Sequence, residues 1–146
     1  MKTQNTLRWS DVWLLMAIYA AKDRRPAALR DILAAADAIY HAVMNYEELA
    51  SGLVRLEQAA LIRVSSDLSH IECSTKGLEV VAPNVQRVGR ANEARKVIEH
   101  QLNVTPWAPK EPIPHPANNL QYPGLTADIH NEAVNDYLES MKKRRR

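Results

Sequence analysis

The chain has 146 residues, 46% of them hydrophobic, and this length and composition predict one domain with a substantial apolar core plus appendages. The formal net charge of +2, from 19 basic and 17 acidic residues, neither requires nor excludes a polyanionic partner. Cys73 is the only cysteine, so the chain can form no internal disulfide and no cysteine cluster for a metal. A reducing, cytoplasmic setting is therefore expected.

The first predicted element is a buried helix over residues 12–21, which are all apolar. Ser10 or Asp11 can cap it. The run is too short to cross a membrane, which takes about 17 residues or more, and we expect no membrane partner. A signal-peptide core behind Lys2 and Arg8 is the alternative. Neighbouring tryptophans, the acidic Asp11 and the absence of an A-x-A site favour the helix.

Two more helices are predicted up to residue 60. Pro26 suits the first turn of the second helix, which has one apolar stripe formed by Leu29, Ile32, Leu33 and Ala36. Asn45 opens the third helix, and Glu48, three residues later, completes a capping-box pattern. The core face of this helix is predicted to carry Leu49, Leu53, Leu56 and Ala60.

The hydrophobic period then changes from 3.6 to 2. Ile62 and Val64 alternate with polar residues, as do Ile71 and Cys73, which predicts an antiparallel hairpin around a turn at residues 66–69. Ser74 or Thr75 caps a further helix that is expected to stop before Pro83. Its core residues are expected to be Leu78, Val80 and Val81.

Three helices, a hairpin and a closing helix, in this order, form the plan of a winged helix-turn-helix domain. The chain also resembles the MarR and PadR winged-helix regulators of bacteria. Residues 46–49 (Tyr-Glu-Glu-Leu) lead to residues 53–63 (Leu-Val-Arg-Leu-Glu-Gln-Ala-Ala-Leu-Ile-Arg), and residues 74–77 (Ser-Thr-Lys-Gly) follow the hairpin. In that group a leucine-rich phrase ends the recognition helix and a Thr-x-Lys-Gly-like phrase starts the helix after the wing. The resemblance covers about half of the chain.

The predicted fold class is mainly α with a small β-hairpin wing, a winged helix-turn-helix followed by C-terminal helices. Residues 7–83 form the winged domain, and residues 84–104 contain an additional helix. Residues 105–125 hold six of the eight prolines and are predicted to form an extended arm, and residues 126–146 an amphipathic helix capped by Thr126, with a basic tail.

The resemblance implies a small transcriptional regulator that binds double-stranded DNA as a homodimer, to which the C-terminal arm and helix contribute. In such domains the third helix enters the major groove, where Arg55 can read guanine and Gln58 adenine. The candidate DNA-binding residues are Tyr46, Ser51, Arg55, Gln58, Arg24, Arg25, Arg30 and Arg63. The cations of residues 24–30 are expected near the phosphate backbone.

The charges around the third helix are evidence against ordinary docking into a DNA groove. Residues 45–74 contain two cations, Arg55 and Arg63, and five anions, Glu47, Glu48, Glu57, Asp67 and Glu72. A net charge of −3 repels phosphate, on which duplex binding depends heavily. The alternative is a winged helix used for protein interaction, with its acidic third helix towards a basic partner or towards solvent. Trp107, among prolines, is a candidate anchor for such an interface.

Catalysis is the class with the least support. No nucleophile, base and orienting group occur together, and the five histidines do not share a spacing with a carboxylate or Cys73 that would indicate a metal. His41, among apolar neighbours, is expected to be a packing residue. The four glycines form no phosphate-binding loop. We therefore expect no enzyme activity, no cofactor and no metal.

Overall fold

A computed structural model describes residues 7–21, 28–40, 42, 44–65, 68, 70–88, 90–102, 104 and 125–144. Within them the helices are α1 (Trp9–Ala20), α2 (Leu29–Tyr40), α3 (Tyr46–Gln58), α4 (Thr75–Val88), α5 (Ala91–Gln101) and α6 (Ala127–Arg144), and the strands are β1 (Ile62–Val64) and β2 (Ile71–Cys73). The fold is mainly helical with a small antiparallel hairpin, as predicted, and it is compatible with a winged helix. Pro26, His41, Trp107 and most of the predicted arm lie outside the described residues.

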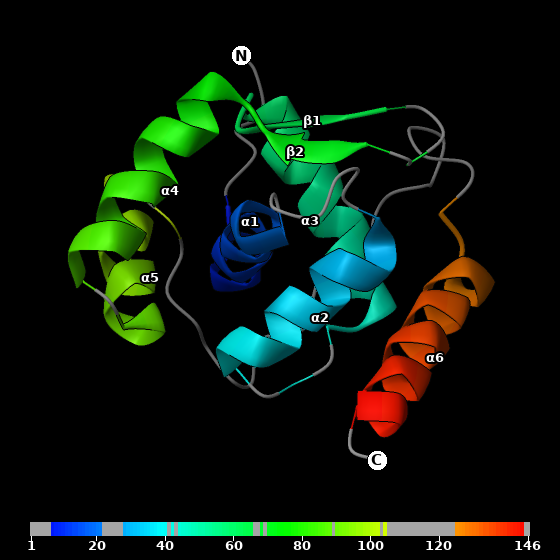
Figure 1. The fold of residues 1–146 in the computed structure, drawn as a ribbon. Coiled ribbons are helices and arrows are strands. Elements are labelled where there is room, and N and C mark those ends of the chain that lie inside the picture. Colours follow the sequence, from blue (N-terminus) through cyan, green and yellow to red (C-terminus); the bar gives the residue numbers. More distant parts are fainter. Residues whose placement is uncertain are drawn as a thin grey trace, which may run out of the picture.

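Helix α1 is central (Figure 1). It contacts α2, α3, α4, α5 and β2, and every residue from 10 to 18 is buried. A helix with apolar residues on all its faces needs cover on all its faces, and the surrounding elements provide it. The uninterrupted apolar run of the sequence therefore marks the centre of the fold.

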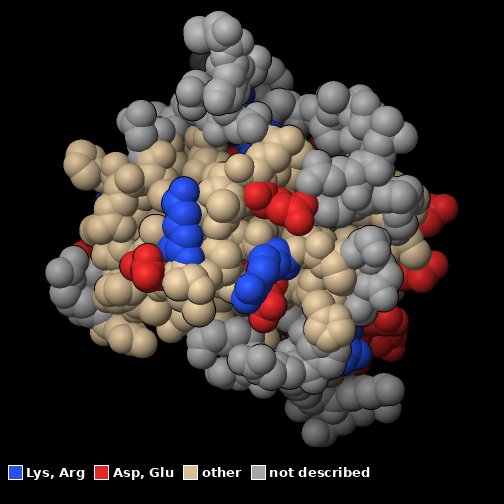
Figure 2. All heavy atoms as spheres, turned by 90° about the horizontal axis from the view of Figure 1, so that it is seen from above, with Lys and Arg blue, Asp and Glu red and all other residues tan. Residues whose placement is uncertain are grey.

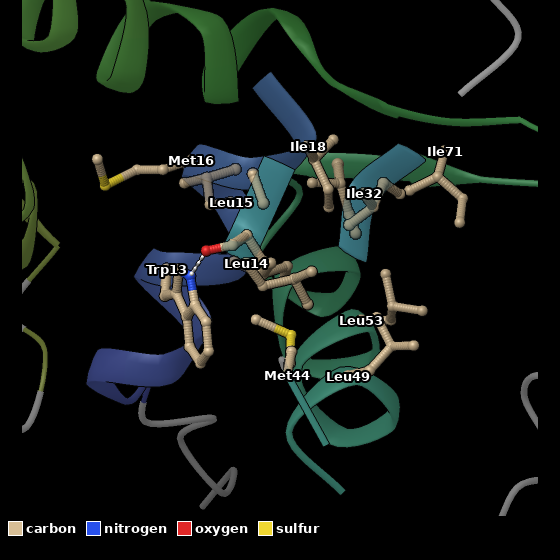
Figure 3. Close-up of a cluster of buried hydrophobic side chains, with 14 of the residues drawn as sticks. Trp13, Leu14, Leu15, Met16, Ile18, Ile32, Met44, Leu49, Leu53 and Ile71 are labelled. Atoms are coloured by element: carbon tan, nitrogen blue, oxygen red, sulfur yellow. Dashed lines mark hydrogen bonds between the residues drawn. The ribbon is translucent and has the colours of Figure 1, made fainter. Parts of the chain in front are cut away.

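Trp13 joins α1 to α2 in the core (Figure 3). Its indole Nε1 donates to the Ala36 carbonyl at 3.0 Å, so the buried ring has its one polar group satisfied. The ring stacks on Trp9, with centroids 5.8 Å apart, and meets Tyr40 edge-on at 5.7 Å. The four residues of the predicted α2 stripe are all buried in the core: Leu29, Ile32, Leu33 and Ala36.

Helix α3 ends earlier than the leucine spacing predicts. Ala60 was expected on its core face, but the helix stops at Gln58, and Ala60 is exposed with a φ of 64°. The Leu61 amide donates to the Leu56 carbonyl at 3.0 Å and the Ala60 amide to the Glu57 carbonyl at 2.9 Å. These two bonds form a Schellman C-cap, which turns the chain sharply into the hairpin.

The hairpin confirms the predicted change of period. Ile62 pairs with Cys73, Arg63 with Glu72 and Val64 with Ile71. The hairpin lies at the top of Figure 1, the side from which Figure 2 looks at the molecule. Gly77, in the first turn of α4, explains the glycine of the Thr-Lys-Gly phrase, because a Cβ there would lie 2.1 Å from the Leu61 carbonyl oxygen. Only glycine lets α4 approach the start of the hairpin this closely.

The break between α4 and α5 differs from the prediction. Helix α4 does not stop before Pro83 but continues through it to Val88, and α5 begins at Ala91 rather than at residue 84. Proline removes one helical hydrogen bond without preventing the helix from continuing when packing holds both sides. Val81, two residues before Pro83, is fully buried, whereas Leu78, which the sequence predicts in the core, is 39% exposed.

Helix α6 packs on α2 of the same chain. In Figure 1 it lies on the side of the molecule opposite α4 and α5. Thr126 caps it as predicted, its Oγ1 accepting from the Ile129 amide at 3.2 Å. The predicted apolar face is only partly covered: Ala133 is buried, while Ile129 and Leu138 are exposed at its margins.

Candidate functional site

The start of α3 has the cap that the sequence predicts. The Glu48 amide donates to Asn45 Oδ1 at 2.8 Å, and the Asn45 amide donates to a Glu48 carboxylate oxygen at 3.0 Å. Glu48 is buried, and this burial raises the pKa of its carboxyl group, with a further rise from the charge of Glu47 and an opposing effect of the Asn45 amide. The cap fixes where the helix begins and which of its residues face outwards.

Arg55, the predicted guanine reader, forms an ion pair with Asp11 of α1. Its Nε donates to Asp11 Oδ2 at 2.6 Å and its Nη2 to Asp11 Oδ1 at 2.9 Å, and the same Nη2 lies 3.3 Å from Ser51 Oγ. The Arg55 side chain is 14% exposed and that of Asp11 is fully buried. Reading guanine would require the same two-point hydrogen bonding from Arg55, whose donors are already occupied by the Asp11 carboxylate.

Asp11 is the third residue of α1, and its Oδ2 accepts from the amide of the N-cap residue Arg8 at 2.8 Å, so the helix starts before Ser10 and Asp11, the two caps that the sequence predicts. Burial is the largest influence on the pKa of the Asp11 carboxyl and raises it, whereas the hydrogen bonds and charges of Arg55 and Arg8 oppose this rise. Gly52 allows the approach of the two helices: a Cβ there would lie 2.7 Å from Leu14 Cδ2 and 3.2 Å from Asp11 Oδ1. The ion pair therefore belongs to the contact between α1 and α3.

The middle of α3 is covered on all its sides. The six consecutive residues 48–53 are all buried, and they span more than one full helical turn. Ser51, a predicted contact residue, is 3% exposed and donates from its Oγ to the Glu47 carbonyl. Tyr46 is half-buried and donates from its hydroxyl to the Leu125 carbonyl at 3.3 Å. Of the predicted residues on this helix, Gln58 alone is exposed.

The two described strands of the wing carry one cation and one anion. Arg63 and Glu72 are directly opposite each other on β1 and β2, and their side chains form an exposed ion pair at 3.3 Å. The nearby Lys76 donates from its Nζ to the Ala59 carbonyl at the end of α3, at 3.1 Å. In the described part of the face shown in Figure 2, the few basic side chains lie close to acidic ones and form no continuous positive patch.

The cations predicted around the start of α2 are only partly described. Arg24 and Arg25 lie outside the described residues. Arg30 is exposed on the first turn of α2 and forms no ion pair with the described part of the chain. The eight candidate residues are therefore not brought together on one positive surface by the residues that the structure describes.

Two contacts that sequence reasoning missed involve Asp11 and His130. The sequence suggests Asp11 only as a helix cap and as an acidic residue that does not suit a signal peptide. His130 is buried on α6, and its Nε2 lies 2.8 Å from the Met44 carbonyl, so this nitrogen is the donor. The sequence does mark Asp11, because it is a charged residue at the edge of the longest apolar run. No local pattern marks His130.

No group of three or more metal-ligating side chains occurs within the described ranges, and Cys73 is buried as a free thiol. None of the helices in these ranges is both long and apolar enough to cross a membrane. Comparison of the chain with protein-family models, with curated proteins and with solved structures gave no match. The functional argument consequently depends on the geometry of the site.

Proposed function

We propose that this chain is a winged-helix protein that acts by binding another protein and does not read DNA bases with α3. The ion pair between Arg55 and Asp11 carries the proposal. To contact guanine, Arg55 would have to leave a buried carboxylate without its partner, which typically costs about 3–5 kcal/mol. A good bidentate base contact contributes only about 1–3 kcal/mol of discrimination, so the exchange is unfavourable.

The charge distribution supports the same proposal. Glu47 and Glu57 are partly exposed on α3, and the cation of the wing is already paired with Glu72. A surface without an excess of positive charge suits a protein interface better than a phosphate backbone. The partly exposed carboxylates of α3 favour a partner with a basic surface.

A DNA-binding regulator of the MarR or PadR kind is the second candidate. The order of the elements favours it, and so do the exposed Gln58 and Arg30, which forms no ion pair with the described residues. In that function the chain would act in the cytoplasm as a homodimer, with Arg30 on phosphate and Gln58 at a base edge.

Duplex binding separates the two candidates. We expect a fluorescently labelled duplex of random sequence to show no saturable anisotropy change with the chain at about 50 mM salt, where non-specific binding through phosphates is strong. Binding that weakens steeply towards about 200 mM salt, and that weakens again in the Arg30→Gln and Gln58→Ala variants, would instead establish the second candidate.

The protein-binding proposal also needs a positive test. Chemical cross-linking of the full chain in its native cell, followed by mass spectrometry, should identify a partner cross-linked near α3 that the Glu57→Lys variant loses. The Glu139→Lys variant makes the same charge change on α6 and should retain that partner. If both variants keep every cross-linked partner, α3 does not provide the interface.

A further inference from the structure

The ion pair between Asp11 and Arg55 connects α3 to the central helix α1 (Figure 1). Its two members differ in their access to solvent. Asp11 is fixed on a helix whose residues 10–18 are all buried, and its side chain is fully enclosed. The Arg55 side chain is partly exposed and ends a long, flexible stem. Arg55 can therefore leave the pair without a rearrangement of the core, whereas Asp11 cannot.

The negative charge of Asp11 is what holds Arg55 on α1. The Asp11 carboxylate accepts two hydrogen bonds from the Arg55 guanidinium and one from the Arg8 amide, as a buried charge requires. If Arg55 leaves while Asp11 is charged, a buried charge loses its partner, which is strongly unfavourable. A protonated Asp11 is neutral, so the departure of Arg55 then breaks hydrogen bonds but strands no charge, and it costs far less.

The surroundings of Asp11 decide how readily it takes up a proton. Helices α2, α4 and α5 and strand β2 also pack on α1, but the charged groups that act on Asp11 are Arg55 of α3 and Arg8 at the start of α1. Both cations favour the carboxylate. Burial outweighs them and raises the pKa of the Asp11 carboxyl above its ordinary value of 3.8. The folded chain therefore takes up this proton in weaker acid than an unfolded chain would.

We propose that the pair is an acid-sensitive latch, in which a proton from solvent on Asp11 releases the Arg55 side chain and adds an exposed cation to α3. The partly exposed charges of Glu47 and Glu57 on this helix are negative. A released Arg55 offsets them, so acid lowers the attraction of α3 for a basic partner. This consequence for binding rests on the proposed function, whereas the release of Arg55 does not.

An NMR titration of the full chain from about pH 8 to about pH 4 tests the latch directly. The carboxyl ¹³C shift of Asp11 follows its protonation, and the Nε–H resonance of Arg55 follows the contact. Both should change with the same midpoint. The indole N–H resonance of Trp13, which is bonded to the Ala36 carbonyl, should stay fixed while the core is intact. An unchanged Arg55 resonance when Asp11 is protonated, or unfolding before Asp11 takes up its proton, would overturn the proposal.

Asp11→Asn imitates the protonated state and keeps an oxygen that can accept from the Arg8 amide. At one pH above the wild-type midpoint, hydrogen exchange at Arg55 Nε should be about tenfold faster in this variant, or more. Glu72→Gln neutralises the partner of Arg63 in the exposed pair of the wing and should leave the exchange at Arg55 unchanged.

Wild-type protection of Arg55 in the Asp11→Asn variant would overturn the latch. If that variant does not fold, the titration of the wild type decides alone. Both measurements use the chain without a partner, so a failure of the latch is distinguishable from a failure of the proposed function.

Discussion

Ala60 is the residue at which the local conformation and the residue type disagree. Its φ of 64° lies in the left-handed region, which costs a residue with a Cβ about 1–2 kcal/mol. Glycine has no such cost but loses about 0.5–1 kcal/mol through its greater freedom in the unfolded chain. Because Ala60 is exposed and no packing is lost, Ala60→Gly should stabilise the protein by about 0.5–1 kcal/mol in urea denaturation.

Ala59 provides the matched control for that substitution. Its φ is −82°, a conformation that alanine adopts without strain. Ala59→Gly should therefore destabilise the protein by about 0.5–1 kcal/mol through the unfolded chain, with a further small loss because the half-buried Ala59 methyl group packs against the core. Equal effects of the two substitutions would mean that the left-handed conformation of Ala60 carries no strain.

Glu48 links stability to pH. Burial raises the pKa of its carboxyl above 4.5 in the folded state, so the folded chain holds this proton more tightly than the unfolded chain does. Its contribution to the free energy of unfolding is complete below about pH 4.5 and is lost as the pH rises through the folded-state pKa. The stability of the wild type relative to Glu48→Gln should therefore fall between about pH 4 and pH 7.

Glutamine preserves the oxygen that accepts from the Asn45 amide, so the comparison changes the charge and keeps the cap. Asp11, whose pKa is also raised, is present in both proteins and cancels. Chemical denaturation of both proteins across this pH range measures the difference. A difference that grows with pH would show that the cap stabilises the carboxylate more than burial penalises it.

The pairing of Arg55 illustrates what the sequence could not predict at this scale. Its place on the helix was predictable from the capping box and the leucine spacing, and so was its position away from the face that carries the core leucines. Its partner Asp11 is 44 residues away in the chain, and the contact depends on the close approach that Gly52 allows. No periodicity carries that information, because it arises only when α1 and α3 pack together.

Among the elements, those with a complete local signal were predictable. Helix α3 has both members of its capping box, and the hairpin has its period-2 alternation on both strands. The boundary between α4 and α5 was predicted wrongly, because proline usually ends a helix whereas Pro83 lies inside one. Tertiary packing of α4 on α1 and α5 outweighs the local preference of the proline.

Pro83 should therefore limit the stability of α4. Without an amide hydrogen, it leaves the Glu79 carbonyl without its helical donor, and Pro83 is exposed, so little packing depends on its ring. After allowance for the greater freedom of the unfolded chain, we expect Pro83→Ala to stabilise the protein by about 1–2 kcal/mol in thermal or urea denaturation.

Pro83→Gly separates the two contributions to this effect. Glycine restores the donor but is about 1 kcal/mol less favourable than alanine within a helix, so its gain should be correspondingly smaller. If Pro83→Ala instead lowers stability, α4 requires the local geometry that proline imposes in order to pack against α5.

At the scale of the whole molecule, α6 packs its apolar face against α2 of its own chain. Leu125 and Ala133 join the core cluster, and the hydrogen bonds of His130 and Tyr137 connect the helix to both ends of the segment 37–44. A homodimer built on this helix must accordingly use the margins marked by Ile129 and Leu138, or exchange α6 between two chains. Sequence periodicity predicted the apolar face but not the surface that covers it.

Deletion of residues 105–146 tests whether this region stabilises the fold and whether it holds a homodimer together. Removing α6 uncovers α2 and leaves the buried Met44 carbonyl without its donor, so the free energy of unfolding should fall by about 3 kcal/mol or more, and the urea m-value should fall with the smaller buried surface. His130→Leu, which removes the donor but keeps the helix, should account for about 1–3 kcal/mol of this loss.

The molar mass of the same proteins, measured by light scattering, separates packing within one chain from assembly. If the C-terminal arm and helix hold a homodimer, the full chain has twice its sequence mass of 16.5 kDa and the deletion variant is a monomer. A dimeric His130→Leu protein would then place the dimer contacts on the outer margins of α6, because its inner anchor is gone. A dimer that survives the deletion would move the interface to residues 1–104, where α3 and the wing are the candidate surfaces, and assembly would then compete with any other partner of α3.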